Sequence, residues 1–351
     1  MKKSFTLALA VLTVALLAGI KTATVAEESR NPVPDMVRRL ELGKPVSHGS
    51  LTIIPVYLDR VLDRTLYATM EDALKNGWIT ITEVEGGRVP QVKISNPSKH
   101  LVFLMGGEIL TGCRQDRILA ADILLAPGTK DLLAPVYCVE QGRWSHVSHS
   151  FFSKQNLGTP ALRARAQEKS PAAQSEIWGR IAEENRVMGV TSATGAYQDA
   201  YEKEENRTQI LKIEEKMKDI PRLHADTVGV VIGLGGEVVS ADIFANPDLF
   251  LKQWTKILKS SALSSLGSAR GGSLDRDAAA EFLRSFVDRK YRSQSGLDLG
   301  VEYTSIDSDA NIQTLVYNDG VVHLAAFPQE KDRIKVIRDD GGDARVQLRL
   351  R

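Results

Sequence analysis

Two short polar segments hold most of the residues in this sequence that could do chemistry. Residues 106–117 read GGEILTGCRQDR, and residues 137–144 read YCVEQGRW. The stretch between them is almost wholly apolar and contains Pro127-Gly128. This pair suits a type II turn, because proline presets one central position and glycine takes the positive φ at the next. A hairpin over this stretch would bring its ends together, so we predict one shared patch of polar side chains.

The basic and amide side chains of these segments suit the recognition of an anion. Planar guanidinium groups bind phosphate or carboxylate through two parallel hydrogen bonds, and tryptophan offers a stacking surface for a base or sugar ring. The predicted ligand-binding residues are Arg114, Gln115, Arg117, Gln141, Arg143 and Trp144. The alternative is structural: Arg117 or Arg143 pairs with Glu108 or Glu140 and pins the loops. The sequence leaves both open.

Glu108 and Glu140 are the candidate catalytic residues. Two neighbouring carboxylates can divide acid and base roles when their surroundings separate their pKa values. On that interpretation the protein is a hydrolase of a phosphate- or ribose-containing substrate. His146 and His149 are spaced weakly for metal binding, and we expect them to be exposed loop residues. No metal or other cofactor is predicted.

Cys113 and Cys138 are the only cysteines, and each lies in one of the two polar segments. A disulfide between them would staple the hairpin ends together, and export to an oxidising compartment would favour it. Such a bond requires the two Cα atoms to lie within ~7 Å of each other. The alternative is that Cys138 is a small buried apolar residue on a strand.

Residues 1–26 have the three-part pattern of a secretory signal peptide. Lys2 and Lys3 precede an uncharged apolar run over residues 5–20, and small residues precede Glu27. The run is shorter than the ~20 residues that a membrane-spanning helix needs. We therefore expect cleavage after Ala26, export to the periplasm or the cell exterior, and no membrane attachment afterwards.

The charge of the cleaved chain bounds its partners. Cleavage removes three of the 45 basic residues and none of the 44 acidic residues, which leaves a net charge of −2. No sustained basic stretch is present, so nucleic acid is not a predicted partner. An anionic small molecule is the predicted ligand. A structural or partner-binding module of the cell envelope is the further alternative, and the sequence identifies no protein partner.

The hydrophobic patterning predicts an α+β protein with a mainly antiparallel β core, sandwich-like or a meander, and several packed helices. Residues 27–47 are polar and interrupted by prolines, which indicates a leader, and residues 329–351 form a charged tail. Residues 48–328 are expected to form one composite domain. Within it, 48–145 is β-rich, 160–222 is helical and 226–328 mixes strands and helices.

Local signals define several elements of this domain. Residues 51–58 and 118–125 are strand candidates, and a capping box at Thr69 begins a short helix. The GLGG segment at 233–236 lacks the Lys-Ser/Thr ending of a phosphate loop and predicts a hairpin turn. Residues 318–320 read Asn-Asp-Gly, a second hairpin turn within a closing meander.

The motifs GGEILTGCRQDR and PVYCVEQGRW together resemble an uncharacterised prokaryotic family, the ADP-ribosylglycohydrolase and rhodanese-phosphatase-superfamily-associated protein domain. The later stretch VVIGLGGEVVSADIFANPDLFLKQWTKIL is similar to the second half of that family. The resemblance covers about residues 48–328, which favours one composite domain over two. By gene association alone, the family name implies a role near ADP-ribose or nucleotide metabolism.

Overall fold

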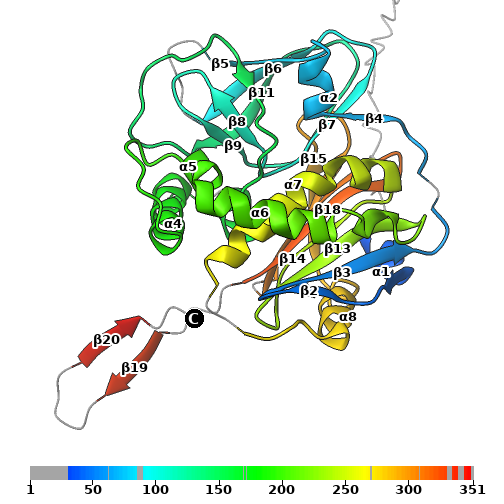
Figure 1. Ribbon diagram of the computed structural model, residues 1–351. Helices are drawn as coiled ribbons and strands as arrows, with labels where there is room; N and C mark the ends of the chain where they lie inside the picture. Colours follow the sequence, from blue (N-terminus) through cyan, green and yellow to red (C-terminus); the bar gives the residue numbers. More distant parts are fainter. Residues whose placement is uncertain are drawn as a thin grey trace, which may run out of the picture. The chain divides into compact units, whose positions relative to one another are not determined.

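The computed structural model describes residues 31–61, 63–84, 90–168, 170, 172–268, 271–307 and 309–329, and the backbone of 334–338 and 344–348. Nine strands form the largest sheet: β1 (Leu40–Leu42), β2 (Val46–His48), β3 (Leu51–Leu58), β13 (Thr227–Leu234), β14 (Glu237–Ile243), β15 (Tyr291–Ser295), β16 (Val301–Ser305), β17 (Ala310–Tyr317) and β18 (Gly320–Pro328). Their order is β1-β3-β13-β14-β18-β17-β16-β15, with β2 also paired to β3 (Figure 1). The strands β15 to β18 form the predicted closing meander.

The chain segment between β3 and β13 forms two smaller sheets. The three-stranded sheet has the order β10 (Ile123–Leu125), β7 (Leu101–Leu104), β4 (Tyr67–Thr69). The six-stranded sheet has the order β12 (Phe151–Phe152), β8 (Ile109–Gly112), β9 (Arg117–Leu119), β11 (Thr129–Cys138), β6 (Gln91–Asn96), β5 (Thr80–Glu83). Only β4 and β7 pair in parallel among the described strands. A mainly antiparallel β architecture is therefore confirmed.

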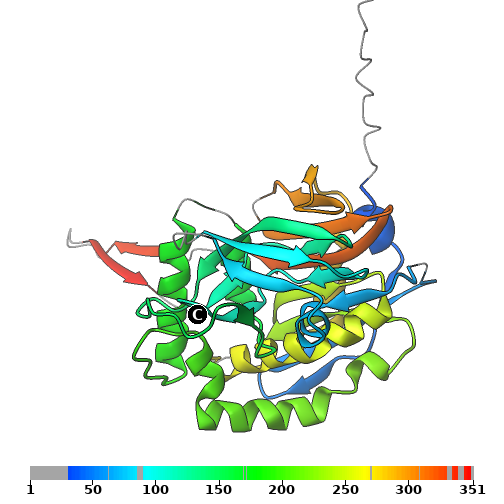
Figure 2. The same ribbon diagram turned by 90° about the horizontal axis from the view of Figure 1, so that it is seen from above.

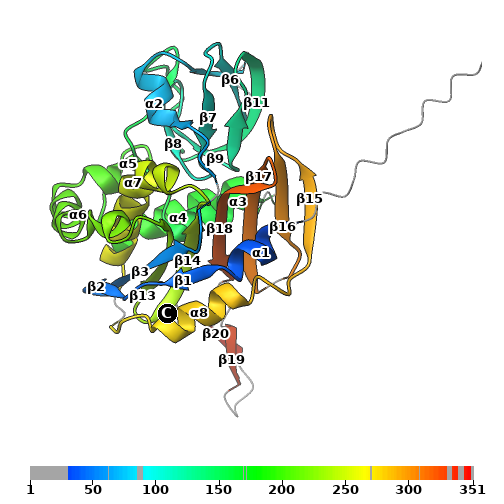
Figure 3. The ribbon, with the colours of Figure 1, turned by 90° about the vertical axis from the view of Figure 1, so that its right-hand side faces the viewer.

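Helices pack on both faces of the nine-stranded sheet and also on the smaller sheets. They are α1 (Val33–Val37), α2 (Met70–Lys75), α3 (Pro160–Gln167), α4 (Ala173–Val187), α5 (Gln198–Glu202), α6 (Glu204–Met217), α7 (Pro247–Leu266) and α8 (Arg276–Arg284). The α+β class predicted from the sequence is thus confirmed. α6 lies alongside α7 (Figures 1 and 2), whereas α1 and α8 lie on the other side of the sheet (Figure 3). Among the described residues, no helix combines the length and apolar character that crossing a bilayer requires.

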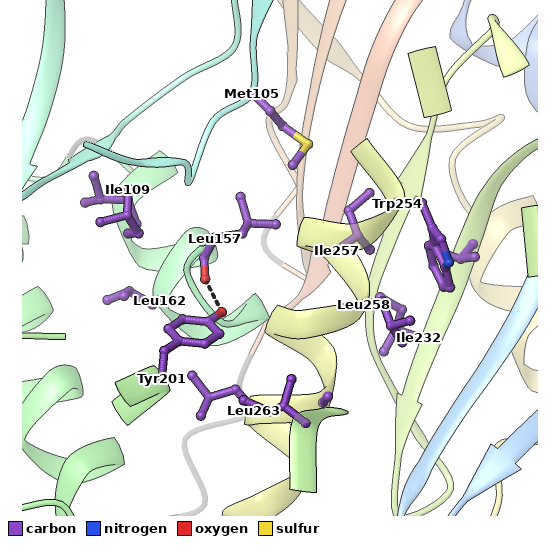
Figure 4. Close-up of a cluster of buried hydrophobic side chains, with 14 of the residues drawn as sticks. Met105, Ile109, Leu157, Leu162, Tyr201, Ile232, Trp254, Ile257, Leu258 and Leu263 are labelled. Atoms are coloured by element: carbon purple, nitrogen blue, oxygen red, sulfur yellow. Dashed lines mark hydrogen bonds between the residues drawn. The ribbon is translucent and has the colours of Figure 1, made fainter. Parts of the chain in front are cut away.

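Alternation along the strands explains these two covered faces. Successive side chains of a strand point to opposite faces, so neighbouring residues of β3 enter different cores. Ile53 packs in the cluster that contains Trp254 of α7, which Figure 4 shows in close-up. Ile54 packs instead with Phe286 and with residues of α1 and α8. Because both faces are buried, nearly every residue of β3 is apolar.

The segment expected to be a leader contributes to the fold. Within residues 27–47, α1 buries Val33, Met36 and Val37 in the core that α8 also joins. β1 then pairs with the far end of β3. Pro32 precedes α1 and Pro34 lies in its first turn, because proline is well tolerated at the start of a helix. The leader prediction is therefore wrong for the described part of this segment, and the residues before it lie outside the description.

The apolar stretch between the two polar segments is divided between two sheets. Residues 118–125 do not form one strand: β9 pairs with β11, while β10 leaves to pair with β7. Ala120 to Asp122 form the connection. The ends of the stretch nevertheless meet, since Arg117 lies opposite Cys138. The prediction of a simple hairpin is therefore wrong, but the two ends of the stretch do lie together, as that prediction required.

The local turn and cap predictions are confirmed. Thr69 and Asp72 form a reciprocal capping box at the start of α2. Gly235 and Gly236 have φ of 59° and 85° and join β13 to β14 as a hairpin. In the predicted tail, β19 (Ile334–Arg338) pairs antiparallel with β20 (Ala344–Leu348). The predicted signal peptide lies outside the described residues.

Candidate functional site

Strand pairing brings the two polar segments to one end of the six-stranded sheet. β9 pairs with β8 on one side, placing Leu110 opposite Arg117, and with β11 on the other. The turn between β8 and β9 and the loop after β11 therefore leave the sheet side by side. β8, β9 and β11 lie together in Figure 1. Most of the polar patch predicted from the sequence is therefore present, but Glu108 lies outside it and pairs with Lys256 of α7.

Arg143 ties the loop after β11 to the turn after β8. Its Nε donates to Glu140 Oε2 at 2.7 Å, and Nη1 donates to the Cys113 carbonyl at 2.8 Å. Nη2 reaches Asp116 Oδ1 at 2.9 Å. Burial raises the pKa of Asp116 above its ordinary value, and the neighbouring Glu140 adds to the rise. Each nitrogen of this guanidinium has a protein acceptor, so Arg143 holds the structure together.

Arg117 has the same structural role, and it is almost completely buried. Its side chain is 2% exposed. Nη1 donates to the Gln115 carbonyl at 3.2 Å and to Gln115 Oε1 at 3.2 Å, and Nη2 lies 3.8 Å from Glu83 Oε1. The structural alternative considered for Arg117 and Arg143 thus fits the geometry, although the carboxylate beside Arg117 is Glu83, which sequence reasoning missed. Glu83 lies in β5, outside both motifs.

The two cysteines are free, so the disulfide considered above is wrong for this structure. Cys138 is buried on β11, and its Sγ donates to Gln115 Oε1 at 3.2 Å. Cys113 lies in the turn after β8 with φ of 49°, where its backbone N–H donates to Ser148 Oγ at 2.8 Å. Burial raises the pKa of both thiols, that of Cys113 to about 11. The buried strand position proposed as the alternative for Cys138 is confirmed.

Helix α4 completes the backbone pairing at the end of β11. Gln174 receives a hydrogen bond from Cys138 N at 2.8 Å and donates to Cys138 O at 2.9 Å. A side-chain amide presents the same donor and acceptor as a peptide unit. It therefore satisfies the strand where the pairing with β6 has ended.

Four predicted or neighbouring residues remain at the surface: Arg114, Gln141, Trp144 and His146. The Arg114 guanidinium carbon lies 5.6 Å from the centroid of the Trp144 ring, and Trp144 is 54% exposed. Arg114 Nε donates to His146 Nε2 at 2.8 Å. Its backbone N–H is held by Glu83 Oε1 at 3.1 Å. His146 and His149 are exposed, as expected.

Glu108 lies in a different network from the surface residues. It is fully buried, its Oε2 accepts from the Met105 N–H at 3.1 Å, and its Oε1 pairs with Lys256 of α7. Lys256 also donates to Glu71 Oε2 at 2.6 Å. Burial raises the pKa of Glu108 to about 7, although the Lys256 ammonium acts in the opposite direction.

Glu140 has none of these neighbours. Its Oε2 accepts from Arg143 and its Oε1 from Thr194 Oγ1 at 2.9 Å. The two candidate catalytic carboxylates share no hydrogen-bonding partner among the described residues. The structure therefore does not join Glu108 and Glu140 into an acid–base pair. Nor does the described part of the chain contain a group of three or more His, Cys, Asp or Glu side chains arranged for a metal ion.

Gly107, directly before Glu108, makes room for an arginine from α3, whereas Gly106 lies close to the Ala121 backbone. A Cβ at Gly107, where φ is 97°, would lie 2.5 Å from Arg163 Cγ. Arg163 Nε donates to the Gly106 carbonyl at 3.3 Å, and the Gly106 N–H donates to Asp122 Oδ1 at 2.7 Å. The Gly-Gly-Glu motif is therefore a junction between α3, α7 and the smaller sheets.

A buried charge network continues from this junction into the nine-stranded sheet. Arg163 binds both carboxylate oxygens of Asp242, at 3.0 and 2.6 Å. His323 contacts Asp122 through Nδ1 at 2.7 Å and Asp242 through Nε2 at 3.2 Å. Burial by itself lowers the pKa of His323, but the two aspartates outweigh it and raise the pKa to about 9. Sequence reasoning missed these four residues because they lie far apart in the chain and form no motif.

Comparison with known proteins is consistent with the motifs. A family model described as ARG and Rhodanese-Phosphatase-superfamily-associated Protein domain matches residues 39–327, most of the chain. No curated protein and no solved structure matches the sequence.

Proposed function

The chain belongs to the ARG and Rhodanese-Phosphatase-superfamily-associated Protein domain family. From this premise, we propose that it is an exported protein that recognises an anionic small molecule with an aromatic ring. The ligand class is nucleotide-like or ADP-ribose-like. Its site is the exposed side of the polar patch, formed by Arg114, Trp144 and Gln141. Export is part of the proposal: protein recovered from the periplasm should lack residues 1–26, which its intact mass checks.

One observation carries this proposal: the difference between Arg114 and the other two motif arginines. Arg117 and Arg143 direct their guanidinium groups at protein oxygens. The terminal nitrogens Nη1 and Nη2 of Arg114 have no hydrogen-bond acceptor among the described residues. Its Nε donates to His146 and lies 3.7 Å from Glu83 Oε2. An arginine with two available N–H-bearing nitrogens presents the edge that binds phosphate bidentately.

Trp144 supports the ring part of the ligand. Trp144 is the most exposed of the four tryptophans, and its ring lies beside the Arg114 guanidinium. Base–aromatic stacking is worth ~1–3 kcal/mol per base when measured by alanine substitution. Gln141 is also exposed and adds an amide suited to sugar hydroxyls. An anion on Arg114 and a ring on Trp144 would thus belong to one molecule.

The buried arginines support recognition indirectly. Arg143 fixes the loop that carries Trp144 to the turn that carries Arg114. A site held by locked side chains loses less conformational entropy on binding. The buried residues Arg117 and Arg143 therefore hold the loops in place, while the exposed residues of the patch would contact the ligand.

A hydrolase with Glu108 and Glu140 as acid and base receives no support from this geometry. Glu108 is fully buried against Lys256, and Glu140 is committed to Arg143 and Thr194. A general base must come within hydrogen-bonding reach of the proton that it abstracts. Neither carboxylate is available at the exposed surface.

A protein-binding surface is the second candidate function, favoured by the exposed apolar side chains around the same loop. Trp144, Val147 and Phe152 are 54%, 62% and 44% exposed. Tryptophan and arginine are frequent hot spots of protein interfaces. Sedimentation of the wild type and Trp144→Ala over a concentration series checks whether this surface mediates self-association.

The ligand proposal is tested by calorimetric titration with ADP-ribose, adenosine and ribose 5-phosphate. We expect ADP-ribose to bind most tightly, because it is the one compound of the three that combines an adenine ring with phosphate groups. Trp144→Ala should lower the affinity for ADP-ribose and for adenosine by roughly fivefold or more, which corresponds to the lower bound for one stacked base. Arg114→Gln should weaken ADP-ribose and ribose 5-phosphate but leave adenosine unchanged.

Arg207→Gln on α6 is the control, because it removes an exposed arginine that is remote in sequence from both motifs. It should bind all three compounds like the wild type. Absence of binding by every anion tested, with a folded wild-type protein, would overturn the proposal. Equal losses in Arg114→Gln and Arg207→Gln would show a charge effect without a site.

A further inference from the structure

The hydrogen bond between Arg114 and His146 fixes the protonation state of the histidine. Arginine is always protonated and has no acceptor, so Nε of Arg114 must donate. His146 Nε2 lies 2.8 Å away and therefore accepts through its lone pair. The imidazole is consequently neutral in this arrangement, with its proton on Nδ1.

Glu83 lies beside this bond as a second partner for both side chains. Its Oε2 is 3.7 Å from Arg114 Nε and 3.9 Å from His146 Nε2. The Glu83 side chain is only 13% exposed and also lies 3.8 Å from Arg117. His146 is therefore faced by one arginine and one carboxylate, with a second arginine behind the carboxylate.

We propose that His146 is a protonation-controlled latch on Arg114. The neutral imidazole holds the guanidinium beside the Trp144 ring. Once Nε2 carries a proton it can no longer accept from Arg114, and two cations at this spacing repel each other. The imidazolium turns its Nε2–H to Glu83, and Arg114 is released.

The consequence for binding rests on the function proposed above. Release frees all the donors of Arg114 for an anionic ligand, and the imidazolium adds a positive charge to the same surface. Histidine is the side chain that ordinarily changes charge between about pH 5 and 8. Half of the His146 side chain is exposed, at 55%, so protons reach it without any opening of the fold. Acidification should therefore strengthen anion binding.

The latch itself is tested without ligand through Trp144 fluorescence between pH 5 and 8. The spectrum of Trp144→Phe is subtracted from that of the wild type to isolate Trp144. We expect the isolated emission to titrate in the wild type and to stay flat in His146→Gln, whose amide oxygen still accepts from Arg114 but does not titrate. A transition that persists in His146→Gln, or none in the wild type, would refute the latch.

Ligand affinity provides a separate readout with ADP-ribose, whose diphosphate linkage keeps its charge over this range. From pH 8 to pH 5.5 the wild type should bind roughly two- to fivefold more tightly, the scale of an exposed charge interaction. His146→Gln should show no such change, and adenosine binding should be independent of pH in both proteins. A fluorescence transition without any ligand binding would retain the latch and reject the proposed function. Binding without pH dependence would reject the latch and retain the function.

Discussion

At the scale of single residues, three arginines of one motif region differ in what they do. Arg114, Arg117 and Arg143 look equivalent in the sequence, and all three were predicted to bind a ligand. Arg117 and Arg143 instead donate their hydrogen bonds to backbone carbonyls and side-chain oxygens of the protein, while Arg114 lies beside Trp144 at the surface. The number of protein oxygens within reach of each guanidinium decides its role, and that number depends on how the loops meet.

This difference predicts that the same substitution destabilises the protein at one position and has little effect at the other. Arg143→Gln leaves Glu140 and Asp116 partly buried without their cation, so we expect a loss of roughly 2–4 kcal/mol in the free energy of unfolding. Arg114→Gln at the exposed surface should change it by less than about 0.5 kcal/mol. Urea denaturation of both variants measures this. Comparable losses would mean that Arg114 is also structural.

At the scale of elements, the Gly-Gly-Glu motif works as a packing junction. Gly107 adopts a φ of 97° and lies against the Arg163 side chain of α3, and Glu108 follows to meet Lys256 of α7. Arg163 cannot move aside easily, because Asp242 holds its guanidinium through both oxygens. Gly107 is therefore needed for both backbone conformation and space, and Gly106 is close-packed against the Ala121 backbone.

Gly107→Ala therefore combines backbone strain with a steric clash. We expect it to lower the free energy of unfolding by more than about 2 kcal/mol, since both costs are incurred together. Gly128→Ala is the matched control: its φ is 79°, but no atom lies within 4 Å of the added Cβ. That control should lose only about 1 kcal/mol. Equal losses in chemical denaturation would show that strain alone matters at Gly107.

At the scale of the whole molecule, one buried charge network connects the smaller sheets to the nine-stranded sheet. Asp122 follows β9, Asp242 lies on β14, His323 on β18 and Arg163 on α3. The two cations and two carboxylates balance, which removes most of the cost of burying them. Although burial opposes ionisation, Arg163 and His323 hold the pKa of Asp242 below its ordinary range.

The raised pKa of His323, about 9 against an ordinary value of 6.5, makes stability depend on pH. The folded state keeps the proton that the unfolded state has lost, so this contribution is complete below pH 6.5 and disappears as the pH rises through 9. Between pH 7.5 and 9.5 we expect the free energy of unfolding to fall by on the order of 2 kcal/mol.

Comparison with His323→Gln isolates this effect, because other groups titrate in neighbouring ranges. Glu108, with its pKa raised to about 7, makes stability fall mainly between pH 4.5 and 7. His323→Gln should be less stable at pH 7.5 and lose the additional decline above it, whereas His224→Gln at the surface should behave like the wild type. An unchanged slope in His323→Gln would contradict the assignment.

Local signals in the sequence determined much of this protein. The capping box at Thr69 and the glycine turn at 235–236 each depend on neighbours within a few residues, and each was predicted correctly. The family motifs also located the patch, because Arg117 and Cys138 pair across adjacent strands. By contrast, residues 118–125 were assigned to one strand, since apolar patterning does not reveal which sheet a strand joins.

The tertiary structure alone decided which charges face solvent and which face one another. Glu83 contacts Arg114, Arg117 and His146 from a strand outside both motifs. Glu108 pairs with Lys256 of α7 and not with the residues around Glu140. Electrostatic and hydrogen-bonding partners are set by distance in space, and residues far apart in the chain carry no mutual spacing in the sequence. The sequence therefore determined where the polar patch would form, and the packing determined that Arg114, Gln141 and Trp144 are the predicted ligand-binding residues that solvent reaches.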